Sequence, residues 1–178
     1  VLHKYLDHFK RKKINNVIIE ASSHGLDQQR LHCINFKAGI FTNFSQDHLD
    51  YHKNMRTYLN SKLILFKEIL KKKSVIISDK ETQPFLLLKL IAQKKKHKLI
   101  NIEDELKKIK KFLPNISSDF RIKNLAMAVE AIRLCGIKEK LIYKNLKRLK
   151  DVSGRLELVR RFPNDIKVYV DYAHTPDA

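Results

Sequence analysis

The chain has 178 residues, of which 43% are hydrophobic and 31% charged, and its formal net charge is +18 at pH 7. This length suits one full domain, or one domain with part of a second, and the composition is that of an ordinary globular protein. No apolar run approaches the roughly 18 residues of a membrane span, so we expect no membrane partner.

The positive charge raises nucleic acid as a partner. However, only nine of the 37 basic residues are Arg, whereas recognition of phosphates and bases favours the Arg fork. We therefore expect a solvated basic surface and no nucleic acid, and we keep a basic nucleic-acid-binding module as an alternative. Cys33 and Cys135 belong to no metal or redox motif, which favours a reducing, cytoplasmic location.

The first expected elements are an amphipathic helix over residues 2–9 and a short apolar strand over residues 17–19. A wholly apolar strand is typical of a parallel sheet that is covered on both faces. Glu20 ends this strand, where a carboxylate is costly to bury unless it is paired or bound to a metal. A helix-capping or salt-bridged acid is the alternative interpretation of Glu20.

The next strand is expected over residues 38–44 and leads into a polar loop containing Asp47, His48, Asp50 and His52. A helix is expected over residues 55–70, because Leu residues and Phe66 recur there at helical spacing. Open α/β sheets place reactive groups at the carboxyl ends of their strands, in this type of loop. A polar loop that only caps the helix is the alternative.

Further strands are expected over residues 74–78 and 99–102, with helices over residues 82–95, 103–112, 119–135 and 138–149. Gly136 is a suitable residue to end the third of these helices. Strands and helices alternate throughout, which predicts an α/β fold with a mainly parallel sheet.

The pattern changes near Asp151. Residues 152–157 form a turn-like joint, and a turn at residues 163–165 precedes a strand over residues 166–170 that ends in Asp171 and, shortly after, His174. We therefore expect residues 1–150 to form the main domain and residues 151–178 to begin a second α/β, Rossmann-like domain.

Glu20, His48 and Asp171 each follow the carboxyl end of an expected strand. Oxygen ligands with one imidazole suit Mg²⁺ better than Zn²⁺, and His48 and His52 lack the HExxH pattern of a helical zinc pair. With only four glycines, the chain contains no glycine-rich phosphate loop, and Ser22 and Ser23 are not framed as a nucleophile elbow. A metal-dependent phosphohydrolase using the same acids and His48 stays open.

Four motifs occur in order along almost the whole chain. Residues 20–30 read E-A-S-S-H-G-L-D-Q-Q-R, and residues 42–62 contain T-N-F, D-H-L-D-Y-H and Y-L-N-S-K; residues 154–157 read G-R-L-E and residues 170–178 read V-D-Y-A-H-T-P-D-A. The chain thereby resembles the Mur ligases, and within them the type that adds the third amino acid, the UDP-N-acetylmuramoyl-tripeptide synthetases (MurE type).

This resemblance implies an ATP-dependent amide-bond ligase of peptidoglycan precursor synthesis, with Mg²⁺ as cofactor and ATP as co-substrate. The partners would be UDP-MurNAc-L-Ala-D-Glu and a diamino acid, either meso-diaminopimelate or L-lysine, and we expect a monomer. The D-Glu γ-carboxylate would be phosphorylated and then attacked by the amine. Another Mur or folylpolyglutamate-type ligase is the alternative within the superfamily.

The resemblance also assigns residues. Glu20 and His48 would hold Mg²⁺, and Lys62 would be carbamylated, which converts its ammonium into a carboxylate-like metal ligand. His48 and Lys62 would thus be the catalytic pair. The remaining assignments are substrate binding by Ser22, Gln28 and Arg30, and ATP binding by Asn124 (adenine), Arg155 (phosphates), Asp171 (ribose) and His174.

Two departures from the family pattern bear on activity. The phosphate loop G-T-N-G-K-T, which should precede Val1, is not in the sequence, and neither are the N-terminal domain and most of the C-terminal domain. Arg121 stands where the family has the first Asn of F-N-x-x-N, which affects the expected adenine contact. We expect this polypeptide alone neither to hydrolyse ATP nor to ligate.

Overall fold

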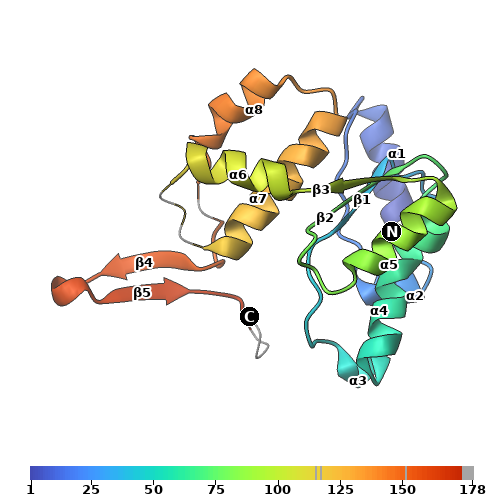
Figure 1. Cartoon of the computed structure of the whole chain (residues 1–178), viewed down its shortest axis with the longest axis horizontal. Coiled ribbons are helices and arrows are strands. Elements are labelled where there is room, and N and C mark those ends of the chain that lie inside the picture. The colour runs from blue at the N-terminus through green and yellow to red at the C-terminus, as the bar shows by residue number, and fades with distance from the viewer. Residues whose placement is uncertain (115, 117, 151, 174–178) are drawn as a thin grey trace.

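A parallel sheet of three strands in the order β1-β2-β3 organises the computed structural model, which describes residues 1–114, 116, 118–150 and 152–173 (Figure 1). The strands are β1 (Ala38–Phe41), β2 (Val75–Ser78) and β3 (Lys98–Asn101). Ala38 is paired with Val75, and Val75 with Lys98. The α/β fold with a parallel sheet predicted from the sequence is confirmed.

The central strand β2 is buried on both faces. Ile76 and Ile77 are neighbours in sequence and therefore point to opposite sides of the sheet, yet each is 0% exposed. Ile76 belongs to one hydrophobic cluster and Ile77 to the other. The sheet is thus the middle layer of three, with helices on each side.

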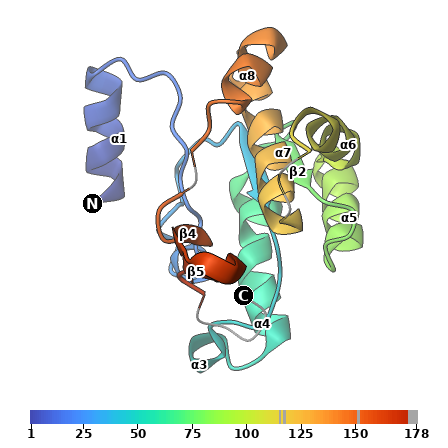
Figure 2. The same ribbon diagram turned by 90° about the vertical axis from the view of Figure 1, so that its left-hand side faces the viewer.

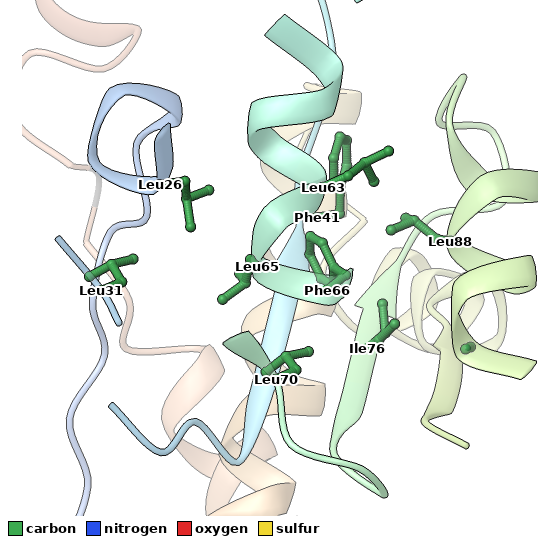
Figure 3. Packing of buried hydrophobic residues seen from close by; sticks show 10 residues of the cluster. Leu26, Leu31, Phe41, Leu63, Leu65, Phe66, Leu70, Ile76 and Leu88 are labelled. Atoms are coloured by element: carbon green, nitrogen blue, oxygen red, sulfur yellow. The ribbon is translucent and has the colours of Figure 1, made fainter. Parts of the chain in front are cut away.

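One face is covered by α4 (Met55–Ile64), a π-helical turn η1 (Leu65–Ile69) that continues it, and α5 (Phe85–Lys95). Figure 3 shows Leu63 and Phe66 packed between Phe41 of β1 and Leu88 of α5. The helix predicted over residues 55–70 is therefore present, with a change of helical type in its last turn.

The other face is covered by α6 (Glu103–Phe112), α7 (Asp119–Leu134) and α8 (Glu139–Leu146). These helices share a buried charged group, because Glu105 is only 2% exposed. It accepts a hydrogen bond from Arg133 at 2.6 Å and one from Tyr143 at 2.5 Å. Burial and the bond to Glu105 raise the pKa of Tyr143 to about 12. Both partners of the carboxylate are therefore held in their protonated, donating forms.

The strand predicted over residues 17–19 is wrong. In the structure this segment is extended without a strand partner, and Ile18 is 89% exposed. An apolar run shows that a segment can be buried, but a strand also needs a neighbour for its backbone hydrogen bonds. Within the described part of the chain, β1 is paired only with β2. The segment links α1 (Leu2–Arg11), whose Leu2 packs at the edge of the cluster that contains Ile76, to α2 (Ser23–Asp27) (Figure 2).

Two further predictions need correction after β1. The strand ends at Phe41 rather than at residue 44, and the expected polar loop contains a short helix, α3 (Leu49–His52). His48 precedes this helix with a left-handed backbone, φ 53° and ψ 29°. Asp50 and His52 are therefore helical residues.

The last described elements are β4 (Glu157–Arg161), a 3-10 turn at Pro163–Asp165 and β5 (Lys167–Val170), which form an antiparallel hairpin (Figure 1). Glu157 closes the turn ahead of the hairpin, since its carboxylate accepts hydrogen bonds from Ser153 at 2.9 Å and from the Gly154 amide at 2.7 Å. This contact explains the G-R-L-E joint. That the hairpin begins a second domain stays a prediction.

Among the described helices, none combines the length and the apolar character that crossing a membrane requires.

Gly39 is required where α4 and η1 approach the sheet. A Cβ built at this position would lie 2.9 Å from Phe66 and 3.2 Å from Leu70. We predict that Gly39→Ala lowers the free energy of unfolding by about 1–3 kcal/mol through overpacking. Urea denaturation measures this, with the exposed Lys98→Ala on β3 as the control, for which we expect a change within about 0.5 kcal/mol. Equal effects of the two variants would contradict the close packing.

His97 gives a second prediction, because it is 8% exposed and neither ring nitrogen has a side-chain hydrogen-bond partner among the described residues. Burial lowers the pKa of His97; the Phe66 carbonyl opposes this shift and the Lys95 cation reinforces it. As the pH falls through about 6.5, His97 is protonated in the unfolded chain at a higher pH than in the folded one. The free energy of unfolding therefore decreases as the pH falls. His97→Phe should flatten the fall in unfolding free energy between about pH 7.5 and 5.5. Parallel curves for the parent and the variant would contradict this.

Candidate functional site

The candidate site begins in the loop that follows β1, at the carboxyl edge of the sheet. Asp47 holds this turn, since its Oδ1 accepts a hydrogen bond from the His48 amide at 2.7 Å and its Oδ2 lies 3.4 Å from His48 Nε2. The left-handed backbone of His48 redirects the chain into α3. Asp47 and His48 thus stabilise the turn before α3, and His48 also places one imidazole at the edge of the sheet.

Lys62 lies on α4, with its Nζ 4.9 Å from the centre of the Tyr58 ring. Burial lowers the pKa of Lys62, while the carboxylates of Asp47 and Glu20 act in the opposite direction. Both acids are therefore close enough to influence the amine electrostatically. Burial therefore makes Lys62 easier to deprotonate than an ordinary lysine, which is a property of reactive amines.

Tyr58 joins these groups and was not predicted as a site residue. It is 4% exposed, and its ring centre lies 5.9 Å from that of His48 and 5.2 Å from that of His52. Burial raises the pKa of Tyr58, and Asp47 acts in the same direction. The signal in the sequence was present, because Tyr58 is one helical turn before Lys62.

His52 is the second residue near the site to which the sequence assigned no role. It is 3% exposed; Ser23 Oγ lies 2.9 Å from its Nε2, and Ser61 Oγ lies 3.5 Å from its Nδ1. Burial lowers the pKa of His52, and the neighbouring His24 lowers it further, against the effect of Asp27. Hydroxyl groups therefore face both ring nitrogens of His52.

The predicted substrate-binding residues lie on and just after α2. Ser22 caps this helix, since its Oγ accepts a hydrogen bond from the Gly25 amide at 3.1 Å. Gln28 and Arg30 are exposed and bonded to each other at 2.5 Å. Gln28 also donates to Tyr51 at 3.4 Å. The structure therefore brings Gln28 and Arg30 together and gives Ser22 a structural role as well.

On the nucleotide side, Asn124 is exposed on α7 next to Lys123. Lys123 forms ion pairs with Asp79 at 2.7 Å and Glu81 at 2.6 Å, just after β2. Hydrogen bonds to both acids raise the pKa of Lys123. Asp79 is 3% exposed and follows a buried strand, so the argument applied to Glu20 should have identified it. This ion pair ties the helix that carries Asn124 to the carboxyl edge of the sheet.

Arg155 and Asp171 come together at the open end of the hairpin, where Glu157 is paired with Val170. The Arg155 guanidinium lies 5.0 Å from the centre of the Tyr172 ring, and the Tyr172 amide donates to Asp171 at 2.7 Å. His174 lies outside the described residues.

Among the residues that the structure describes, no group of three or more His, Cys, Asp or Glu side chains could hold a metal ion. The described structure therefore offers no support for the cluster of Glu20, His48 and Asp171 expected for a phosphohydrolase. The set implied by the resemblance, Glu20 and His48 with a carbamylated Lys62, uses a modified lysine as its third donor and stays a prediction.

Comparison with known proteins places these residues in a family. The family described as Mur ligase middle domain matches residues 1–138. The chain is similar to the UDP-N-acetylmuramoyl-L-alanyl-D-glutamate–2,6-diaminopimelate ligase of Aquifex aeolicus, at 37% identity over 99% of this chain and 39% of the relative. The enzyme of the same name from Rhizobium meliloti is 34% identical over 99% of this chain and 41% of its own length. The chain thus spans about two fifths of these relatives.

A solved structure with a similar fold is that of MurF from Acinetobacter baumannii, with a TM-score of 0.54 and 13% identity over 71% of this chain and 32% of that one. At this identity the likeness concerns the fold alone. It agrees with the three-layer α/β arrangement around β2.

The environment of Lys62 yields a prediction. Labelling of Lys62 by an amine-reactive anhydride, followed by mass spectrometry as a function of pH, should have its midpoint below the ordinary lysine value of about 10.4. Glu20→Gln removes a carboxylate that raises the pKa of Lys62, so the midpoint should fall further. A control is Asp7→Asn on α1, whose only described partner is Arg11, which should leave the midpoint unchanged. A midpoint at the ordinary value in the parent would contradict the burial of the amine.

Proposed function

The chain belongs to the Mur ligase family, and we propose that it acts as the central part of an ATP-dependent ligase that adds 2,6-diaminopimelate to UDP-MurNAc-L-Ala-D-Glu. The names of the relatives, each matched over 99% of this chain, support this substrate. The observation that carries the proposal is Lys62, a lysine of lowered pKa placed over Tyr58 and influenced by Glu20 and Asp47.

In the proposed reaction an oxygen of the D-Glu γ-carboxylate attacks the γ-phosphorus of ATP, which forms an acyl phosphate and releases ADP. The amine nitrogen of the diamino acid then attacks the acyl carbon. The new C–N bond forms, the bond from carbon to the phosphate oxygen breaks, and the amine loses a proton as phosphate leaves. Several anionic oxygens must be brought together, so cations and hydrogen-bond donors carry the catalysis.

Lys62 has the properties expected of the carbamylated metal ligand. Carbamylation requires a neutral amine, which attacks CO₂ and loses a proton to give a carbamate. The lowered pKa of Lys62 favours that neutral form. With the carbamate in place, Glu20, His48 and Lys62 would offer oxygen donors and one imidazole, a set that suits Mg²⁺. Mg²⁺ would supply charge neutralisation for the transferring phosphoryl group.

The other residues divide between two substrates. Arg30 donates a hydrogen bond to Gln28 at 2.5 Å and is exposed, so its guanidinium could bind an anionic group of the UDP-sugar peptide. Ser22, at the start of the same segment, would contact the same substrate. The residues proposed for ATP are Asn124 for the adenine, Arg155 for the phosphates, Asp171 for the ribose, and His174. We also propose a monomer in the cytoplasm, where ATP and nucleotide-linked substrates are found.

The test is ligation by the complete gene product containing this segment. We expect phosphate release that requires ATP, the UDP-linked dipeptide and 2,6-diaminopimelate together. Lys62→Ala should lower the rate by about 10²-fold or more, as for the loss of a group that stabilises transition-state charge. Lys71→Ala, which changes an exposed lysine beyond η1, should retain activity. The segment alone should release no substrate-dependent phosphate.

Other outcomes would contradict the proposal. Phosphate release from simple esters without an amine acceptor would instead support a phosphohydrolase. Equal activity of the Lys62 and Lys71 variants would remove Lys62 from the mechanism.

A further inference from the structure

A hydrogen-bonded network joins three helices beside the proposed site. It is centred on His52 at the end of α3, which faces Ser23 of α2 at 2.9 Å and Ser61 of α4 at 3.5 Å. All three residues are at most 3% exposed. Ser61 and Tyr51 also reach the two oxygens of Asp27, at 3.4 Å and 2.8 Å. The contacts connect segments that are 29 and 34 positions apart in sequence.

The arrangement of donors assigns the tautomer of His52. The Ser61 hydroxyl has one proton, and two acceptors share it, the Thr57 carbonyl at 3.1 Å and Asp27 Oδ1 at 3.4 Å. Ser61 therefore accepts from His52, which places the imidazole proton on Nδ1. Nε2 is then an acceptor for the Ser23 hydroxyl at 2.9 Å. In this tautomer neither ring nitrogen of the buried side chain is left without a partner, as a stable buried network requires.

The network lies between the two parts of the proposed site. On one side, Asp27 and Tyr51 lead to Gln28, which holds Arg30. On the other side, Ser61 immediately precedes Lys62 on α4. The His52 ring also packs against the Tyr58 ring at 5.2 Å, and Tyr58 lies beneath Lys62 Nζ.

We propose that His52 is a positioning residue, which fixes the segment carrying Gln28 and Arg30 against the helix carrying Lys62 by bridging Ser23 and Ser61. The ligands assigned to Arg30 and Lys62 rest on the proposed function, whereas the contacts of His52 with Ser23 and Ser61 do not depend on it. His97 provides the comparison, because it is a buried histidine whose ring nitrogens have no side-chain hydrogen-bond partner among the described residues. Burial by itself therefore does not produce such a bridge in this protein.

The experiment measures amide hydrogen exchange in the chain and in His52→Phe, which keeps an aromatic ring but removes both hydrogen bonds. We expect exchange in residues 23–30 and in α4 to rise about tenfold or more, as for the loss of one or two net hydrogen bonds. The matched control His97→Phe should leave exchange in residues 23–30 unchanged. His52→Gln, which can still bond to Ser23, should restore part of the protection.

Ser23→Ala removes one hydroxyl and leaves His52 in place, so it should raise exchange in residues 23–30 even if His52→Phe does not fold. A rise spread evenly over the chain, or an equal rise in the His97 variant, would overturn the proposal. In the complete ligase, His52→Phe should raise KM for the UDP-linked dipeptide more than KM for ATP. The exchange data do not depend on catalysis, so failure of the ligase proposal and failure of the bridge would be seen separately.

Discussion

The burial of β2 on both faces is the constraint on which the rest of the structure depends. Ile76 and Ile77 face opposite sides and are both 0% exposed, so helices must cover the sheet on each side. On the central strand, those helices leave only the two ends open. The polar residues of the candidate site therefore gather beyond the carboxyl ends of β1 and β2, where a buried sheet still meets solvent.

Two carboxylates are buried among the described residues, and each has a cationic partner. Glu105 lies between Arg133 and Tyr143, and Asp79 is paired with Lys123. Breaking one partner of such a pair costs more than the pair itself contributes, because the remaining charge stays buried. Both carboxylates therefore act mainly to specify how the helices sit on the sheet. The Asp79 pair does this for α7, on which Asn124 is exposed.

Much of the fold and part of the site could be predicted from the sequence. Alternating strands and helices indicated the parallel sheet, and the resemblance to the Mur ligases pointed to Lys62, which lies on α4. The strand expected over residues 17–19 was wrong because an apolar run does not reveal whether a pairing neighbour exists. Tyr58 and the bridging role of His52 were missed for a related reason. Their importance comes from contacts with Ser23 and His48, which lie far away in the chain or on another helix.

Among the described residues, the strands of the hairpin pair only with each other, and Val159 is 58% and Val168 42% exposed. Unpaired strand edges can pair with the same strand in another molecule, which is the first step of many aggregates. Lys167 of β5 is paired with Asp165 at 3.1 Å, whereas Arg160 and Arg161 of β4 add positive charge to the hairpin, which opposes the approach of a second copy. That repulsion is screened over about 8 Å at physiological salt. The colloidal stability of the chain thus depends in part on ionic strength, through the charges of Arg160 and Arg161.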